Sequence, residues 1–124
     1  MAALPDLVID SWKKRTGPIV FSTVDAYGIP NSIYATCVSI YDSETIVIAN
    51  NYFNKTLKNI LNGSKGSILF LTEENKSFQI KGNIEYHTSG KIFEDMKKWN
   101  PENLPGHAAA ALKVEEVYSG SEKL

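Results

Sequence analysis

Residues 45–60 read TIVIANNYFNKTLKNI, and this stretch carries the strongest indications of the fold. The first six, Thr45–Asn50, are almost all apolar or β-branched, which predicts a buried strand. Asn54 is a typical N-cap residue and Gly63 a typical helix stop, so the pattern predicts a helix over 55–62. The residues expected on its buried face are Leu57, Ile60 and Leu61. The stretch therefore predicts a buried strand, a short loop and a helix in direct succession.

Extended runs on both sides of this stretch, separated by polar turns, indicate a mainly β protein. Short strands at close spacing favour a barrel or sandwich over alternating strands and helices. Residues 108–118 are ambiguous, because the alanines favour a helix while Leu112 and Val114 alternate as in a strand; we interpret them as a strand. Gly82 interrupts the alternation of an earlier run, which is typical of a bulge or of a close approach by another backbone. The other predicted strands cover residues 19–24, 30–40, 66–72 and 77–86.

Two further helices are predicted outside the central stretch. The first covers residues 4–15, where basic residues suit its C-terminal end and Gly17 and Pro18 stop it. The second covers residues 90–99, with Thr88 or Ser89 as its cap. Residues 4–118 are then expected to form one domain, followed by a polar tail over 119–124.

Composition excludes several classes of function. The 124 residues include 13 basic and 14 acidic ones, so the net charge of -1 argues against broad electrostatic binding of nucleic acid. The single cysteine, Cys37, excludes an internal disulfide and a cysteine-based metal site, and His87 and His107 lack a surrounding ligand set. No apolar run is long enough to cross a membrane and no signal peptide is recognisable. We expect a cytoplasmic protein with no metal and no membrane or nucleic-acid partner.

Lys55 and Thr56 open the predicted helix after residue 54. A cation and a hydroxyl beside a helix N-terminus are a plausible site for an anion, above all a phosphate. The alternative is that Asn54 simply caps the helix while Lys55 and Thr56 face water. Capped surface helices are common, so composition alone favours this alternative.

The same stretch resembles the phosphate-binding segment of the FMN-binding split-barrel family, which includes pyridoxamine-phosphate oxidases and small one-domain FMN-binding proteins. Similarity continues through Asp25–Gly28 followed by Pro30, which is similar to the first hairpin of the family. Residues 78–82 resemble its fifth strand, and residues 88–96 resemble the helix after it. The resemblance covers about residues 5–118. It implies a six-stranded antiparallel split β-barrel (Greek key) with flanking α-helices.

The resemblance also implies a cofactor site. Lys55 and Thr56 match the residues that bind the phosphate of FMN, next to Asn54, where the oxidases usually have a basic residue. Two strand segments match those that line the flavin ring. They are Tyr34, Ala35 and Thr36 in the first, and Ala49, Asn50 and Asn51 in the second.

The resemblance implies that the protein is an FMN-binding flavoprotein, either an oxidoreductase or an electron carrier. It also implies a homodimer with the flavin at the subunit interface. No side chain stands out as a general acid or base, so no catalytic residue is assigned. The chain ends without the Arg and His extension of the oxidases, so we do not expect the vitamin B6 oxidase itself. The alternatives are a non-redox binding module for haem or a deazaflavin, and a structural dimer whose flavin site has decayed.

Overall fold

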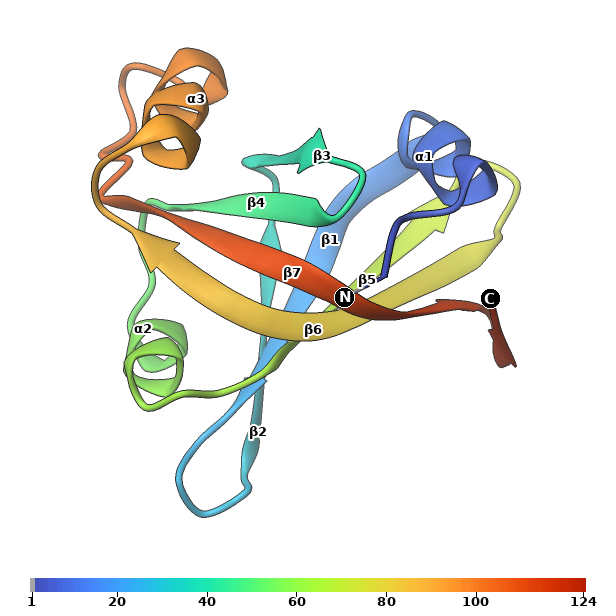
Figure 1. The fold of residues 1–124 in the computed structure, drawn as a ribbon, viewed down its shortest axis with the longest axis horizontal. Coiled ribbons are helices and arrows are strands. Elements are labelled where there is room, and N and C mark those ends of the chain that lie inside the picture. The colour runs from blue at the N-terminus through green and yellow to red at the C-terminus, as the bar shows by residue number, and fades with distance from the viewer. Residues whose placement is uncertain (1) are drawn as a thin grey trace.

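The computed structural model describes residues 2–124, which form one curled sheet of eight strands with three helices around it (Figure 1). The helices are α1 (Asp6–Trp12), α2 (Lys55–Leu61) and α3 (Lys91–Trp99). The strands are β1 (Arg15–Val24), β2 (Pro30–Ala35), β3 (Val38–Asp42), β4 (Thr45–Asn50), β5 (Gly66–Thr72), β6 (Ser77–His87), β7 (Ala108–Ser119) and β8 (Glu122–Lys123).

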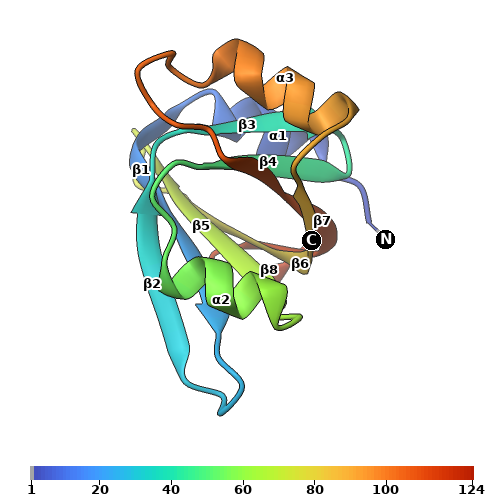
Figure 2. The same ribbon diagram turned by 90° about the vertical axis from the view of Figure 1, so that its left-hand side faces the viewer.

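Neighbouring strands are all antiparallel and run in the order β2-β1-β5-β6-β7-β4-β3, with β8 beside β7. β2 and β3 therefore stand at opposite ends of the order, although only residues 36–37 separate them in the chain. The sheet has to curl for these two ends to meet, and Figure 2 shows it as a strongly curved, partly open barrel. The predicted mainly β, antiparallel barrel with flanking helices is confirmed.

The predicted number of six strands is wrong, for two local reasons. The expected strand over 30–40 is broken at residues 36–37 into β2 and β3, because the chain crosses there from one end of the sheet to the other. No Gly or Pro marks this break. The alternation of side chains shifts there by one residue, because Ile33 and Ala35 before the break and Val38 and Ile40 after it all pack in the main core, whereas Cys37 packs with the second cluster. In addition, the expected polar tail turns back at Gly120, and β8 pairs with the end of β7.

β4 is buried at all of its residues because both faces of this part of the sheet are covered. Ile46 and Ile48 belong to the main core inside the barrel, whereas Val47 and Ala49 pack with Met96 of α3 on the outside. This arrangement explains why the sequence of β4 is continuously apolar instead of alternating.

The alanine-rich segment is a strand, as predicted, and its alanines have a packing role. Ala110 lies in the main core, while Ala109 and Ala111 lie in the second cluster under α3. Small side chains on this outer face leave room for the helix to lie close to the sheet. Pairing with β4 and β6 on either side thus overrides the helical propensity of alanine.

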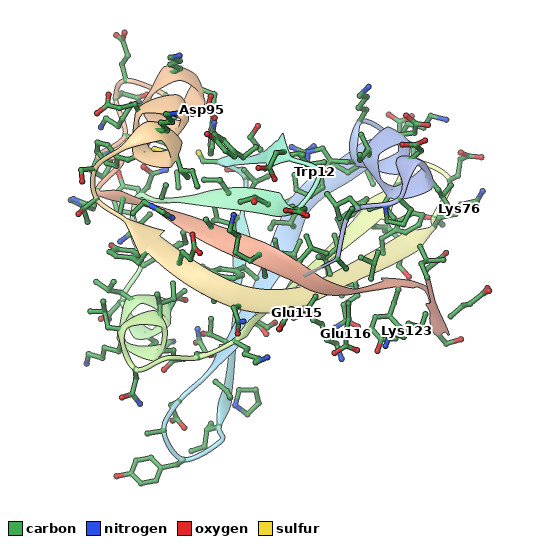
Figure 3. All side chains as sticks on the ribbon, viewed as in Figure 1. Trp12, Lys76, Asp95, Glu115, Glu116 and Lys123 are labelled. Atoms are coloured by element: carbon green, nitrogen blue, oxygen red, sulfur yellow. The ribbon has the colours of Figure 1, made fainter. Side chains whose placement is uncertain are left out.

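The N-terminal helix is shorter than predicted, and Arg15 begins β1 instead of closing the helix. The Arg15 guanidinium lies 4.3 Å from the centre of the Trp12 ring and donates to the Trp12 carbonyl oxygen at 3.0 Å. Trp12 (labelled in Figure 3) packs edge-on against Phe70 of β5. Gly17 and Pro18, which were expected to stop the helix, lie within β1 instead. The pairing of β1 with β5 is irregular there, and Gly17 has a φ of 70°.

The predicted caps of the other two helices also differ from the structure. Gly90, not Thr88 or Ser89, is the N-cap residue of α3, and no side chain caps it. Asn54 does occupy the N-cap position of α2, but its side chain makes no capping hydrogen bond.

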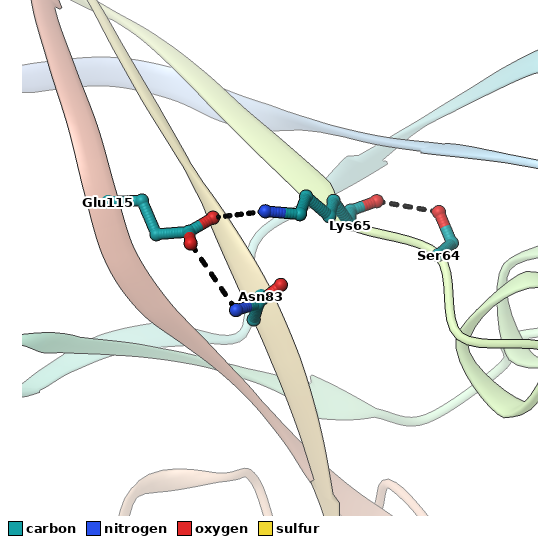
Figure 4. A network of polar contacts seen from close by, with 4 residues as sticks. All are labelled: Ser64, Lys65, Asn83 and Glu115. Carbon is teal, nitrogen blue, oxygen red and sulfur yellow. Dashed lines mark hydrogen bonds and ion pairs between the residues drawn. The ribbon is translucent and has the colours of Figure 1, made fainter. Parts of the chain in front are cut away.

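A bulge at Gly82 shapes the long β6–β7 pair, as the sequence predicted. The register shifts there, so that Gly82 pairs with Val114, Lys81 pairs with Glu116, and Glu115 is left over. A Cβ atom at Gly82 would lie 1.8 Å from the Lys113 carbonyl oxygen, so only glycine fits. The carboxylate of Glu115 accepts hydrogen bonds from Lys65 at 2.9 Å and from Asn83 at 3.4 Å (Figure 4).

Candidate functional site

A crevice between β2 and residues 49–62 contains most of the predicted site residues. It has two parts that share no lining residue and follow one another along β2, and the Asn31 side chain of β2 donates to the Thr56 hydroxyl of α2 at 3.1 Å. We call the part beside residues 33–37 the apolar pocket and the part beside residues 29–31 the basic groove. Their lining residues come from β2 and the turn before it and from α2 and the loop before it, and Figure 2 shows these elements on the same side of the barrel.

The apolar pocket has a volume of about 360 Å³, within the lower part of the range known for small-molecule sites. It brings together five of the nine residues predicted to bind the cofactor, although they come from two distant segments. Tyr34 is 77% exposed at its rim. The lining consists of Ile33, Tyr34, Ala35, Thr36, Cys37, Ala49, Asn51, Tyr52, Phe53 and Leu104.

The basic groove has a volume of about 780 Å³ and lies between α2 and the β1–β2 turn. Lys55 and Lys58 lie one helical turn apart on its α2 side, and among residues 2–124 neither has an acidic group within 4 Å. Two amine groups of the same sign side by side make this end of the crevice attractive to an anion. The other lining residues are Asp25, Ala26, Tyr27, Ile29, Pro30, Asn31, Asn59, Leu61 and Asn62.

α2 presents a different face to the barrel from the one predicted. Leu61 is 68% exposed, so its placement in the buried stripe is wrong, and Leu57 is only half-buried. The buried residues are Thr56, Asn59 and Ile60. The Asn59 amide donates to the Thr23 hydroxyl of β1 at 3.0 Å. Polar contacts to β1 and β2 therefore hold the helix in place beside one apolar anchor.

Thr56 is not among the lining residues of either part of the crevice, and its hydroxyl is already engaged. Its exposed fraction is 1%, and its oxygen accepts from Asn31. The hydroxyl therefore faces β2, whereas Lys55 reaches the groove. Of the predicted phosphate-binding pair, Lys55 is the free cation in the described residues.

Asn50 and Asn51 end β4 and have structural hydrogen bonds. Asn50 accepts from the Phe53 amide at 2.9 Å and donates to the Tyr86 hydroxyl at 2.6 Å, which shapes the loop toward α2. Asn51 accepts from the Gly106 amide at 2.9 Å and exchanges two hydrogen bonds with Asn100. Their side chains hold the walls of the crevice, and their contacts with a cofactor stay a prediction.

Asn31 and Leu104 contribute to the crevice without having been singled out from the sequence. Asn31 lies in the expected strand but carries no motif, and Leu104 lies in the irregular segment after α3. That segment comes to the pocket because Asn51 binds both of its ends. The only sequence signal for Asn31 was its alternation with Ile33 and Ala35, which places all three residues on one face of β2.

Within residues 2–124, no group of three or more His, Cys, Asp or Glu side chains is arranged to hold a metal ion. His87 pairs with Glu85 at 3.0 Å instead of facing the crevice. In the same residues no helix is both long and apolar enough to cross a membrane. The crevice offers apolar walls, amides and lysines, which suits the binding of a planar anionic ligand better than acid–base chemistry.

A sequence model of the pyridoxamine 5'-phosphate oxidase family matches residues 8–120. The chain belongs to this family. Among its relatives is an uncharacterized protein of Methanocaldococcus jannaschii, 33% identical over 113 residues that make up 86% of this chain and 76% of the relative.

Solved structures with the same fold include proteins described by different ligands. HupZ of Group A Streptococcus is 26% identical with a TM-score of 0.81, covering 94% of this chain and 93% of that one. An FMN-binding protein from Syntrophomonas wolfei has 20% identity and a TM-score of 0.74, covering 93% and 91%. HutZ, the haem storage protein of Vibrio cholerae, has 16% identity and a TM-score of 0.69, covering 95% of each chain. The split-barrel fold of the family is therefore shared by proteins named for FMN and for haem.

Proposed function

We propose that this protein binds FMN in the crevice along β2 and works as an oxidoreductase or an electron carrier. The observation that carries the proposal is the placement of Lys55, without an acidic group within 4 Å in the described residues, close to an apolar pocket in a member of this family. A flavin has the matching distribution of charge, with a planar ring at one end and a phosphate at the other. The FMN-binding neighbour from Syntrophomonas wolfei supports the choice of ligand.

The residues of the crevice fit FMN in a specific way. Ala35, Ala49 and Phe53 offer apolar surface to the ring, and Lys55 offers a charge-assisted hydrogen bond to the phosphate. Thr56 and Asn31 hold the wall between the two ends. FMN, when bound, supplies the redox chemistry of its ring, while these residues bind it, orient it and limit its contact with water.

A second copy of the chain completes the site in this proposal. Tyr34, Val20 and Leu69 are cross-strand neighbours on the outer face of β2, β1 and β5, and Tyr34 also borders the apolar pocket. Leu69 and Leu71 are each 42% exposed on this face. An exposed apolar row that ends at the mouth of a ligand pocket is the surface expected of a subunit interface.

Absorbance and calorimetry test the binding of FMN. The purified protein is expected to take up FMN in a ratio of one per chain and to show the two flavin bands after gel filtration. A protein that stays colourless with excess FMN and gives no heat of binding would refute the proposal. Oxidation of reduced nicotinamides by the loaded protein then separates an oxidoreductase from an electron carrier.

Gel filtration of a Leu69→Glu variant tests the dimer. The charge on the apolar row is expected to give monomers and to weaken FMN binding. Leu7→Glu is the matched control, because Leu7 is similarly exposed on α1 at a distance from the row. A variant that stays dimeric, or a monomer with unchanged FMN affinity, would contradict a site shared between subunits.

Haem is the second candidate, and HutZ supports it. Cys37 is the one thiol in the lining of the apolar pocket and is half-buried there. Neither His87 nor His107 is among the lining residues of the described crevice. If haem is bound through the Cys37 thiolate, the Cys37→Ser variant would lose the absorbance spectrum of thiolate-ligated haem. The affinity for FMN would not change in that variant.

A further inference from the structure

The basic groove is larger than a single phosphate needs. Its volume of about 780 Å³ exceeds that of the apolar pocket, and it extends from Lys55 to the β1–β2 turn. If the flavin ring lies in the apolar pocket and its phosphate at Lys55, this space lies beyond the phosphate. We propose that the basic groove holds a second nucleotide joined to that phosphate, so that the protein accepts a flavin dinucleotide (FAD). This inference rests on the proposed function and extends it.

The charges of the groove suit a diphosphate. Lys55 and Lys58 are one turn apart on the same side of α2, and the described residues place no acid within 4 Å of either amine. The groove also contains Asp25, whose Oδ1 atom accepts from the backbone amides of Tyr27 and Ile29 at 2.9 Å each. This carboxylate is committed to the turn, and its charge is partly offset by those amides. Two cations against one such carboxylate leave a net positive groove.

The far end of the groove suits a purine ring. Tyr27 is 89% exposed and Ile29 is 60% exposed, and both lie on the turn that faces α2. Aromatic side chains stack on nucleobases and stabilise their binding without sequence preference. Leu61 adds apolar surface from α2, and its exposure is otherwise unexplained by the packing of the barrel.

The order of these features along the crevice specifies the ligand. A ring pocket, two lysines and a second apolar surface follow one another, which matches a flavin, a diphosphate and an adenine. FMN alone would leave Lys58 and Tyr27 without a partner. A nucleotide that is not joined to the flavin would bind to the groove without changing the affinity of the protein for flavin. Such a result would distinguish a separate nucleotide site from the proposed FAD site.

Titration of the full-length protein with riboflavin, FMN and FAD tests the inference. FAD is expected to bind about tenfold more tightly than FMN, because it adds one charge-assisted contact and one stacked ring. FAD that binds no more tightly than FMN would overturn the inference while leaving the proposed function intact. If no flavin binds at all, it is the proposed function that fails.

Two variants locate the effect in the groove. Lys58→Ala and Tyr27→Ser are each expected to remove most of the preference for FAD and to leave riboflavin binding unchanged. Both side chains are exposed, so the thermal unfolding midpoint should stay the same and serves as the check on folding. Lys76→Ala, in the β5–β6 turn at the other end of the barrel, is the matched charge control. A loss of FMN and FAD affinity by equal factors in Lys58→Ala and Tyr27→Ser would contradict a second nucleotide site.

Discussion

Asn51 and Asn100, which are 49 positions apart, form a closed pair of amide hydrogen bonds. Each side-chain nitrogen donates to the oxygen of the other at 3.0 Å, and both residues are buried. The Asn51 oxygen also accepts from the Gly106 amide. One side chain at the end of β4 thus holds both ends of the loop that brings Leu104 to the apolar pocket.

Removing this pair is expected to destabilise the loop and the fold together. Asn51→Ala and Asn100→Ala should each lower the free energy of unfolding by about 1–3 kcal/mol, because each leaves a buried amide unpaired. The double variant should cost clearly less than the sum of the two, since both remove the same pair. Denaturant unfolding measures all three, with Asn103→Ala in the exposed part of the loop as the control. Additive losses would show that the two side chains act independently.

The Gly82 bulge is expected to tolerate no side chain. Gly82→Ala should lower the free energy of unfolding by more than about 3 kcal/mol or prevent folding, because its Cβ meets the Lys113 backbone. Gly66→Ala is the matched control, since a Cβ there would meet the flexible end of Ile84 at 2.7 Å. It should cost about 1–2 kcal/mol. Equal effects of the two variants in thermal unfolding would refute the role of the bulge.

α2 is expected to depend on Ile60 and not on Leu61. Ile60→Ala removes a buried side chain and should cost about 2–4 kcal/mol in denaturant unfolding. Leu61→Ala removes an exposed one and should change stability by less than about 0.5 kcal/mol. A large loss in Leu61→Ala would mean that this residue is covered in solution, as it would be by a subunit contact.

Lys55 is expected to distinguish FMN from riboflavin. Lys55→Ala should weaken FMN binding by about tenfold or more, because only FMN has a phosphate for the lysine to contact. Riboflavin affinity should stay within about a factor of two, and Lys76→Ala should leave both unchanged. Calorimetric titration of the unsubstituted protein and of both variants with each ligand measures the affinities. Equal losses for both ligands would contradict a phosphate contact at Lys55.

The Glu116–Tyr118 pair is expected to make stability depend on pH at acidic values. The Tyr118 hydroxyl donates to Glu116 and, with nearby lysines such as Lys123 (Figure 3), lowers the pKa of the Glu116 carboxyl. Its stabilising contribution is therefore present above the ordinary glutamate pKa and is lost as the pH falls through the lowered value. Conversely, the Glu116 carboxylate raises the pKa of the Tyr118 hydroxyl. The stabilising contribution of Tyr118 is therefore present below the ordinary tyrosine pKa and is lost at alkaline pH, as the pH rises through the raised value.

Tyr118→Phe should move the acid-unfolding midpoint to a higher pH, because the Glu116 carboxylate loses its donor. Unfolding measured between roughly pH 3 and pH 5, around the usual carboxyl range, checks this. Tyr27→Phe is the control, since Tyr27 is exposed and has no such partner in the described residues. An unchanged midpoint in Tyr118→Phe would show that the hydrogen bond contributes nothing measurable in solution.

Much of the strand pattern followed from the residues alone, because strands and turns depend on near neighbours, whereas the predicted side-chain caps of α2 and α3 are absent. The limits of β4 and β5 agree with the sequence pattern, and the Gly82 bulge was expected from one residue out of period. The place of Lys55 after a buried strand made it a candidate anion-binding residue, and only the family resemblance favoured that role, which stays a prediction. Family resemblance then indicated which two segments would meet, and both border the same pocket.

Tertiary structure alone decided the features that join distant parts of the chain. The break at residues 36–37 exists because the sheet has two ends to connect, and no Gly or Pro marks it. Asn51 and Asn100 satisfy one another across 49 positions, and the Asn31–Thr56 bond sets which way the Thr56 hydroxyl faces. Local patterns thus determined most of the strands, while the long-range pairing of buried polar groups determined the shape of the crevice between them, because such groups are stabilised only where the fold supplies a partner.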